Sequence, residues 1–421
     1  MIKKTIQNKF NYYLQKTKTD FSKPEGKFLR QSMLGIMKSK TPIVRQIAHE
    51  LDEDIPLDKT TKRLRNHINK DGFWKKLVQS HNKNIKHRIK DNDYAVLDIT
   101  DINKDEANCM EGLDRVWDGD EEEIVDGYLM MNILRVGRSD QELTPQYCKL
   151  FSHNMDTKSE NTEILSAFNT VDSQIDKEMI RVVDRGGDRK KLIYPFLQED
   201  KKFIIRLNGS NNPRHLYYNG SFRSVPKISK DLDLDIKLSS QKREDGKIKT
   251  EYYKAGATRV KFRNPYSKQP MDKELWFVSM KNMEGGYSYY LLNVDIEDRE
   301  EAIRECFQGY GYGWKIEEYH RHMKQEYELE DIKLMNFSAL QNMVTLMMMV
   351  MYIVYTEIGR ISLQVLCKAG PYRPGDLKGF IYYKLGREIA KILSSVTPRK
   401  MIYTNKTHEN KRQLKLGFDT I

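Results

Sequence analysis

The spacing of apolar residues divides the chain into two helical ends and a middle that is rich in strands. Near the N-terminus, Thr41-Pro42 is typical of a helix start, and Ile43, Ile47 and Leu51 then recur at four-residue spacing. A second helix is expected from about Lys59 to Ile68. The link between these two helices is longer than the turn of a helix-turn-helix motif. The pattern therefore predicts a helical module without a secure helix-turn-helix.

Two short apolar runs in the middle of the chain, Tyr94–Ile99 and Ile180–Val183, are typical of buried strands. The first contains Asp98, and the second ends at Asp184. A carboxylate at such a place is costly to bury unless it is paired or binds a metal ion. Each aspartate taken alone would ordinarily be a turn or helix-cap residue.

Strands and helices alternate up to about residue 207, and the pattern changes after that. Tyrosines, basic residues and short alternating strands then dominate up to about residue 293. The later part of the chain has helical spacing again. We therefore expect a helical DNA-binding region over residues 1–90, an α/β core over 91–207, a β-strand insertion over 208–293, a second part of the core over 294–340 and a helical C-terminal region over 341–421.

One helix of the second core part carries the third carboxylate. Glu317 lies seven residues before Lys324, about two turns, so both side chains project from one helix face. A single carboxylate beside a cation usually means a surface ion pair. Three converging carboxylates repel one another unless divalent cations neutralise them. Two such ions, roughly 4 Å apart, can activate water or a 3′ hydroxyl for attack on a phosphodiester.

The composition narrows the class of partner. The formal net charge is +12 and the pI about 9.1, which suits a polyanion. On the second N-terminal helix, Lys62, Arg63 and Arg65 are interpreted as DNA contacts rather than as a purely solvated face. Four scattered cysteines predict neither a disulfide framework nor a zinc site and suit a reducing cytoplasm.

Membrane insertion is not expected from the sequence. The first residues lack an apolar segment of signal-peptide length. The most apolar stretch, Val344–Tyr355, is about 12 residues and too short to span a bilayer. Its methionines are expected to line the protein core.

At these motifs the chain resembles bacterial insertion-sequence transposases of the DDE type, in the insertion-sequence-four family. Asp98-Ile99-Thr100 is similar to the family's first strand motif, and Asp184–Asp188 is similar to its second. Tyr310, Glu317 and Lys324 match its Tyr-Arg-Glu-Lys signature. The motifs cover little of the chain, but their order and separation also fit the family.

The resemblance implies an α/β fold: a ribonuclease-H-like catalytic core with an all-β insertion, plus helical N-terminal and C-terminal regions. It implies that Asp98, Asp184 and Glu317 bind two Mg²⁺ or Mn²⁺ ions, hard cations that prefer oxygen ligands. It also implies that Tyr310 and Lys324 position the phosphates of the element end. The activity would be excision and integration of an insertion element by phosphodiester hydrolysis and strand transfer, through a hairpin intermediate.

Two positions depart from the family pattern. Gly313 stands where the signature has an arginine that is expected to help hold end DNA; Arg321 or Lys315 could compensate. The family's spacing, counted back from Glu317, leads to Tyr289 at the position of a tryptophan that stacks on a flipped base. Aromatic stacking stabilises an unpaired base by about 1–3 kcal/mol. The alternative is that Tyr289 packs in the core.

The expected partners are double-stranded DNA with terminal inverted repeats, target DNA and a second copy of the chain, in the cytoplasm of a bacterium and associated with its nucleoid. Two other functions remain open. One is a ribonuclease-H-like nuclease that cuts DNA without joining it. The other is a transposase-derived DNA-binding protein that is no longer catalytic, which Gly313 would favour.

Overall fold

The structure is a computed structural model. It describes residues 2–361 and 381–396, apart from positions 108, 120, 140, 156, 158 and 245–246. Parts of the expected C-terminal helical region, residues 362–380 and 397–421, lie outside the described residues.

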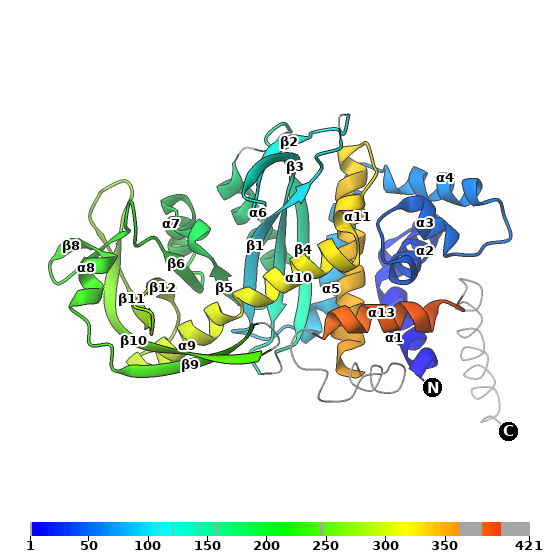
Figure 1. The fold of residues 1–421 in the computed structure, drawn as a ribbon. Coiled ribbons are helices and arrows are strands. Elements are labelled where there is room, and N and C mark those ends of the chain that lie inside the picture. The colour runs from blue at the N-terminus through cyan, green and yellow to red at the C-terminus, as the bar shows by residue number, and fades with distance from the viewer. Residues whose placement is uncertain are drawn as a thin grey trace, which may run out of the picture.

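A mixed sheet flanked by helices forms the centre of the molecule (Figure 1). Its first half has the order β4 (Leu143–Phe151), β3 (Glu123–Val136), β1 (Tyr94–Asn103), β5 (Ile180–Val183) and β6 (Phe203–Leu207). β3 is antiparallel to β1, whereas β1, β5 and β6 are mutually parallel. The expected strands around Asp98 and Asp184 are confirmed, although β1 continues to Asn103 and so places Asp98 in mid-strand.

Helices cover both faces of this half. α6 (Glu160–Gln174) precedes β5, and α7 (Lys190–Gln198) connects β5 to β6. Both pack through apolar side chains against one face, where they share a core with Leu97 and Ile205. α9 (Arg299–Gly311) and α10 (Gly313–Glu326) belong to the core cluster that contains Val96 and Ile204, on the opposite face. α6 is one continuous helix, and α10, which carries Glu317, ends at Glu326.

The strands expected after residue 208 are present, and they continue the same sheet. They are β7 (His215–Tyr218), β8 (Ser221–Ser224), β9 (Ile236–Glu244), β10 (Lys247–Arg263), β11 (Pro270–Asn282) and β12 (Tyr287–Asn293), with the short helix α8 (Val225–Lys230) after β8. β12 pairs with β6, which makes one sheet of 12 strands in the described chain. β2 (Asp114–Asp118) pairs with the far end of β3, and the acidic residues between them form the expected hairpin turn.

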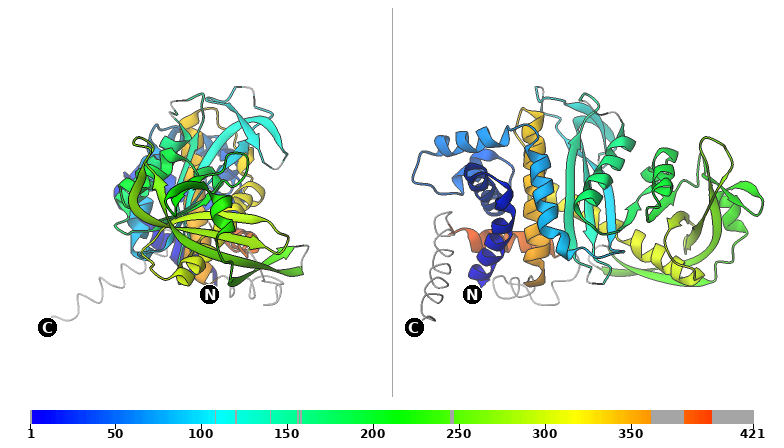
Figure 2. Two further views of the ribbon diagram at one scale, coloured as in Figure 1. Left: turned by 90° about the vertical axis from the view of Figure 1, so that its left-hand side faces the viewer. Right: turned by 180° about the vertical axis from the view of Figure 1, so that it is seen from behind.

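The N-terminal helices pack against the rest of the molecule rather than standing apart (Figure 2). They are α1 (Ile2–Thr17), α2 (Lys23–Ser39), α3 (Val44–His49), α4 (Leu57–Ile68) and α5 (Phe73–Ile85). α2 begins with a capping box between Ser22 and Glu25. The expected start of a helix at Thr41-Pro42 is wrong: α3 begins at Val44, and the Thr41 hydroxyl accepts a hydrogen bond from the Ile43 amide at 3.4 Å.

The most apolar helix lies between the N-terminal helices and the sheet (Figure 1). α11 (Phe337–Tyr352) continues as a π-helical segment, Ile353–Glu357. By length and composition alone this 21-residue helix could cross a bilayer, so the shortness expected from the sequence is wrong. However, 89% of its most apolar window is buried inside the protein, and its methionines line the core as expected. The last described helix, α13 (Tyr382–Leu393), packs nearby.

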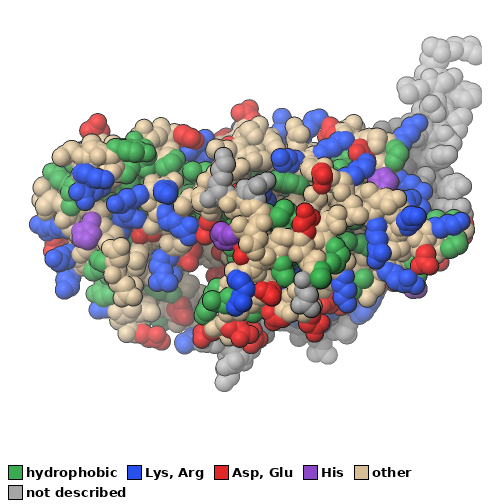
Figure 3. All heavy atoms as spheres, turned by 90° about the horizontal axis from the view of Figure 1, so that it is seen from above, with side chains coloured by type: hydrophobic (Ala, Val, Ile, Leu, Met, Phe, Trp, Pro, Cys, Tyr) green, Lys and Arg blue, Asp and Glu red, His purple; other side chains and the backbone are tan. Residues whose placement is uncertain are grey.

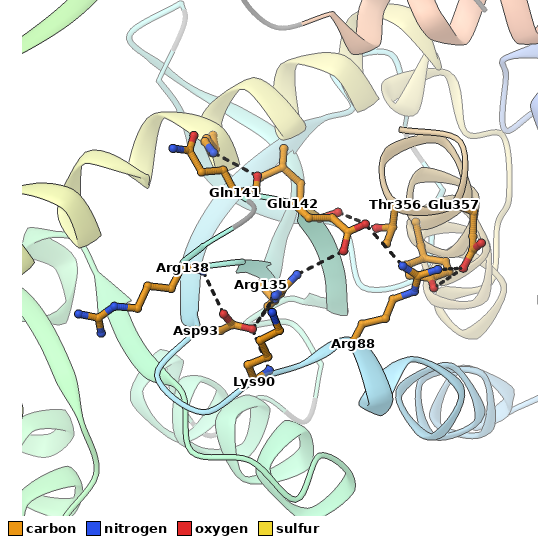
Figure 4. A network of polar contacts seen from close by, with 12 residues as sticks. Arg88, Lys90, Asp93, Arg135, Arg138, Gln141, Glu142, Thr356 and Glu357 are labelled. Atoms are coloured by element: carbon orange, nitrogen blue, oxygen red, sulfur yellow. Dashed lines mark hydrogen bonds and ion pairs between the residues drawn. The ribbon is translucent and has the colours of Figure 1, made fainter. Parts of the chain in front are cut away.

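A chain of buried ion pairs lies at the start of β1 (Figure 4). Arg135 of β3 contacts the Asp93 carboxylate at 2.6 Å and that of Glu142 at 3.5 Å. Arg88 contacts Glu142 at 3.6 Å and Glu357 at 2.7 Å. The network therefore connects the end of the N-terminal helices and the π-helical segment to the half of the sheet that contains β1 and β3.

Candidate active site

Asp98 lies in the middle of β1, opposite Asn132 of β3, and its side chain lies beside α10. Its Oδ2 atom is 3.6 Å from Nδ1 of His320, and Nδ2 of Asn132 lies 3.0 Å from the other ring nitrogen of His320. Burial, with a smaller contribution from Lys324, lowers the pKa of His320 to about 3, so its ring is neutral. A neutral imidazole therefore lies between β1 and β3 and contacts the first carboxylate.

The pKa of Asp98 is strongly perturbed. Burial of the carboxyl, together with the negative charges of Glu317 and Asp184, raises the pKa to about 7. This happens although 36% of the Asp98 side chain remains exposed. Because the charges of Glu317 and Asp184 both act on Asp98, the structure brings the three carboxylates predicted from the sequence into one neighbourhood.

Asp184 directly follows β5, at the carboxyl end of the parallel strands, where open α/β sheets commonly bind ligands. The Tyr310 hydroxyl donates a 2.6 Å hydrogen bond to Asp184 Oδ1. Nη1 of Arg206 lies 3.7 Å from the same oxygen and donates to the Tyr310 hydroxyl at 3.2 Å. Burial and the charge of Asp184 raise the pKa of Tyr310, so its hydroxyl stays protonated and remains a donor.

Glu317 is brought to this edge by a break between two helices. α9 ends at Gly311 and carries Tyr310, and α10 begins at Gly313 and carries the exposed Glu317. Buried side chains of α10, among them Ile316 and His320, hold the helix against the sheet. Tyr310, before this break, contacts Asp184, and the charge of Glu317, after it, acts on Asp98.

The carboxylate oxygens of Asp98, Asp184 and Glu317 suit a hard divalent cation, but their present arrangement does not form a metal-binding site. Among the residues that the structure describes, no group of three His, Cys, Asp or Glu side chains could hold a metal ion as arranged. The chemistry and the charge still fit such an ion, because carboxylate oxygens are hard ligands and the charges of Glu317 and Asp184 add to burial in raising the pKa of Asp98. Asp184, with 60% of its side chain exposed, and Glu317 have room to turn toward Asp98.

Two other residues of α10, the signature residue Lys324 and the expected DNA contact Arg321, pair with protein carboxylates. The Lys324 ammonium lies 2.8 Å from Asp101 and 3.2 Å from Glu330, with 13% of its side chain exposed. Arg321 is more exposed and pairs with Glu318 on the same helix. Asp188, expected as a helix cap, instead accepts hydrogen bonds from the amide of Asn208 and from Arg214.

Comparisons with known proteins add little. No protein-family model matches the sequence, and no curated protein matches it. Among solved structures, the synaptic complex of the piggyBac transposase with hairpin DNA aligns with a TM-score of 0.43 and 12% sequence identity, over 93% of this chain and 76% of that one. A likeness at this level establishes neither a family nor an activity for the chain.

The aromatic residues of β12 form a stack that reaches the surface. Tyr289 is 8% exposed and lies between Phe277 and Tyr287, with ring centroids 6.1 and 6.2 Å apart. The ring next to solvent is Tyr287, which is 45% exposed and has the Lys281 ammonium 5.2 Å above it. The buried position of Tyr289 reflects Gly209, whose missing side chain leaves the room that the ring occupies.

The predicted basic residues of α4 are not equivalent. Lys62 and Arg65 are exposed. Arg63 turns toward the protein, where it contacts Glu53 at 2.5 Å and Gln31 at 3.0 Å. Glu53 belongs to the long link before α4. Because it pairs with Arg63, one of the three residues expected to contact DNA makes its contacts within the protein instead.

Two residues near the carboxylates, Arg206 and His320, were not singled out from the sequence. Arg206 stands next to Asp184 because β5 and β6 pair in register, and the only sequence signal is a charged residue inside the apolar run Phe203–Leu207. His320 follows Glu317 by one helical turn and faces the sheet. Trp314, 48% exposed, lies one turn before Glu317 on the outer side of α10.

Proposed function

We propose that the protein is a DDE-type DNA transposase that excises and integrates an insertion element. The observation that carries this proposal is the convergence of Asp98, Asp184 and Glu317 from two adjacent parallel strands and one helix. Burial of Asp98, with a further contribution from the charges of Glu317 and Asp184, raises its pKa to about 7. The resemblance read from the sequence places its three carboxylates in the same order and in the same kinds of element.

The order of the first five strands supports a ribonuclease-H-like core. Three parallel strands, β1, β5 and β6, are followed outward by the antiparallel strand β3 and then by β4, with α6 and α7 between the later strands. The block β7–β12 enters the chain after β6 and before α9. This is the place that the resemblance gives to an all-β insertion.

Asp98, Asp184 and Glu317 are the residues that would hold two Mg²⁺ or Mn²⁺ ions. Such ions, when bound, neutralise the carboxylates and activate the attacking oxygen. The chain's own contribution is the orientation of these groups. Tyr310 and Arg206 hold Asp184, His320 contacts Asp98, and α10 presents Glu317.

The proposed reaction has four phosphodiester steps at each element end. Water first hydrolyses one strand and leaves a 3′ hydroxyl. That hydroxyl then attacks the phosphodiester of the opposite strand and forms a hairpin, which a second hydrolysis opens before the 3′ end attacks target DNA. An extruded base costs a few kcal/mol of stacking, and the exposed Tyr287 ring offers a surface to recover about 1–3 kcal/mol.

The upper surface suits a duplex. Seen from above, it is hollowed between the two halves of the molecule, and Lys and Arg side chains gather over the half that contains β7–β12 (Figure 3). DNA with terminal inverted repeats, target DNA and a second copy of the chain are the proposed partners, in the bacterial cytoplasm.

A direct test uses the DNA that flanks the gene, supplied with Mg²⁺. The wild-type protein should cut at the tips of inverted repeats and join the freed ends to a target. Glu317→Gln should lower the cleavage rate by a factor of about 10³ or more while it leaves the affinity for the same DNA intact, because Gln keeps the shape and loses the charge. Glu318→Gln, the neighbour that pairs with Arg321, is the matched control and should cut normally.

Three other results of this test would each change the proposal. Normal cleavage by Glu317→Gln would remove Glu317 from the site. Cleavage of branched DNA without joining would make the protein a nuclease. Binding without any cleavage by the wild type would identify a transposase-derived binding protein, the candidate favoured by Gly313 and by a carboxylate group that is not closed into a ligand set.

A further inference from the structure

The N-terminal helices carry a second basic surface that the sequence did not single out. α1 and α5 pack side by side (Figure 2). The Tyr13 hydroxyl lies 2.6 Å from Nδ1 of His81, and Asn84 donates a 3.1 Å hydrogen bond to the Tyr13 carbonyl. Ser80 donates to the Thr17 carbonyl at 3.1 Å. The seam between these helices is therefore fixed by buried polar contacts.

Exposed residues border this seam. Tyr12 and Lys16 each precede a residue of α1 that contacts α5, and Lys83 precedes Asn84 on α5. Tyr12 is 50% exposed, and the Lys16 ammonium lies 4.5 Å from its ring centroid. Lys83 has 67% of its side chain exposed, and Lys86 is exposed one turn further on. We call Tyr12, Lys16, Lys83 and Lys86 the α1–α5 face.

One acid moderates the charge of this face. Asp20 lies 3.1 Å from the Lys83 ammonium and accepts a 2.7 Å hydrogen bond from Ser80. These contacts, with the Ser80 hydrogen bond the largest cause, lower the pKa of Asp20, so the carboxylate is charged at neutral pH. Lys83 is thus positioned by an acid, and the face keeps a net positive charge.

We infer that the α1–α5 face binds the phosphate backbone of double-stranded DNA. The exposed lysines Lys16, Lys83 and Lys86 offer point charges to phosphates, and Tyr12 offers a flat surface to a sugar. The face is held rigidly on the protein core, because α5 also packs on α11 and β4. This inference rests on the proposed function for its ligand, and it differs from the sequence prediction, which placed the contacts on α4.

The test is binding of a labelled inverted-repeat duplex by the full chain, followed by fluorescence anisotropy between about 50 and 200 mM salt without divalent metal. The double variant Lys16→Gln/Lys83→Gln should weaken binding about tenfold and flatten the plot of log affinity against log salt by about two contacts, a slope change of about 1.8. Lys62→Gln/Arg65→Gln on α4 removes the same charge from exposed positions and should change the slope less.

A third variant gives an effect of the opposite sign. Asp20→Asn keeps an oxygen for Ser80 and releases Lys83 from its ion pair, so it should tighten binding by a few fold. A fold disturbed by substitution would not bind more tightly. Lys177→Gln, which removes an exposed lysine paired with Asp91 elsewhere on the molecule, controls for net charge and should bind like the wild type.

An unchanged salt slope in Lys16→Gln/Lys83→Gln, with a reduced slope in the α4 variant, would overturn the inference and return the contacts to α4. Weakened binding with Asp20→Asn would also overturn it. The proposed function fails separately, if wild-type protein does not bind the duplex at all. If Lys16→Gln/Lys83→Gln keeps its affinity for DNA but loses binding to phosphatidylglycerol vesicles, the α1–α5 face binds a lipid surface instead.

Discussion

The environments of two carboxylates differ sharply: Asp93 directly precedes β1, and Asp98 lies in its middle. Asp93 has 2% of its side chain exposed and is surrounded by donors: Arg135 at 2.6 Å and the amides of Lys90 and Arg138. Asp98 is more exposed, yet the charges that act on its pKa are the negative ones of Glu317 and Asp184. Only the second carboxylate lacks compensation of its charge.

This difference separates a structural acid from a candidate catalytic one. The buried network of Figure 4 satisfies its members with opposite charges, which is the condition for tolerating ions in a protein interior. The cluster around Asp98 retains repulsion that a more stable protein would remove. Perturbed groups that gather at an accessible edge are typical of sites under selection for chemistry.

The largest expected stability effect lies at the structural acid. Asp93→Asn should lower the free energy of unfolding by about 3–5 kcal/mol, because it leaves the buried Arg135 without its closest counter-ion. Urea unfolding followed by circular dichroism measures the change. Asp91→Asn breaks an exposed pair with Lys177 two residues away and should cost less than about 1 kcal/mol. Equal losses in the two variants would mean that the network does not stabilise the fold.

Lowering the pH should reduce the stability of the fold through His81, whereas it should relieve the destabilisation caused by Asp98. His81 is fully buried against Tyr13 and Pro145, and burial lowers its pKa to about 4, below the unfolded value of about 6.5. Its contribution to stability is therefore complete above about pH 6.5 and is lost as the pH falls toward 4. At pH 5 the loss should be about 2 kcal/mol.

Proton uptake on unfolding, measured at pH 5 and at pH 7.5, checks this expectation. His320 and His322, with pKa values lowered to about 3 by burial, should add to the uptake at pH 5. His81→Gln should take up about one proton fewer than the wild type. A stability that does not change between these pH values would show that His81 is protonated in the folded protein.

A smaller effect of opposite sign is expected at Asp98. Asp98→Asn should raise the free energy of unfolding by about 1–2 kcal/mol at pH 8 in EDTA, a value reduced to allow for solvent screening. The folded pKa of about 7 exceeds the unfolded one of about 3.9, so the wild-type penalty appears as the pH rises from 4 and is full above 7. The gain should vanish at pH 4. A destabilised Asp98→Asn protein at pH 8 would contradict the contrast with Asp93.

The site residues that could be predicted are those marked by residues nearby in the sequence. Asp98 and Asp184 were found because apolar runs precede them, and Glu317 because helical spacing surrounds it. Arg206 could not be found in that way, because it meets Asp184 only through the pairing of β5 with β6.

Contacts with residues distant in sequence also explain the other differences between the predictions and the structure. Gly209 gives the Tyr289 ring its buried position from the loop after β6, and Glu53 turns Arg63 inward from a preceding loop. The continuity of the sheet from β6 into β12 was equally hidden, because a strand's sequence does not name its partner. Element types were therefore accessible from the sequence, whereas contacts between elements were not.

The smallest expected effect concerns Gly313, where the family signature has an arginine. A Cβ at this position would meet nothing within 4 Å, and the residue opens α10 without a positive φ, so Gly313→Arg should fit without strain. One added phosphate contact should steepen the salt dependence of DNA binding by about 0.9. Gly313→Ala separates this gain from the helix propensity of about 1 kcal/mol that any side chain adds over glycine. If both variants bind DNA alike, position 313 does not face the duplex. The missing arginine is then no argument against the proposed catalytic role of Asp98.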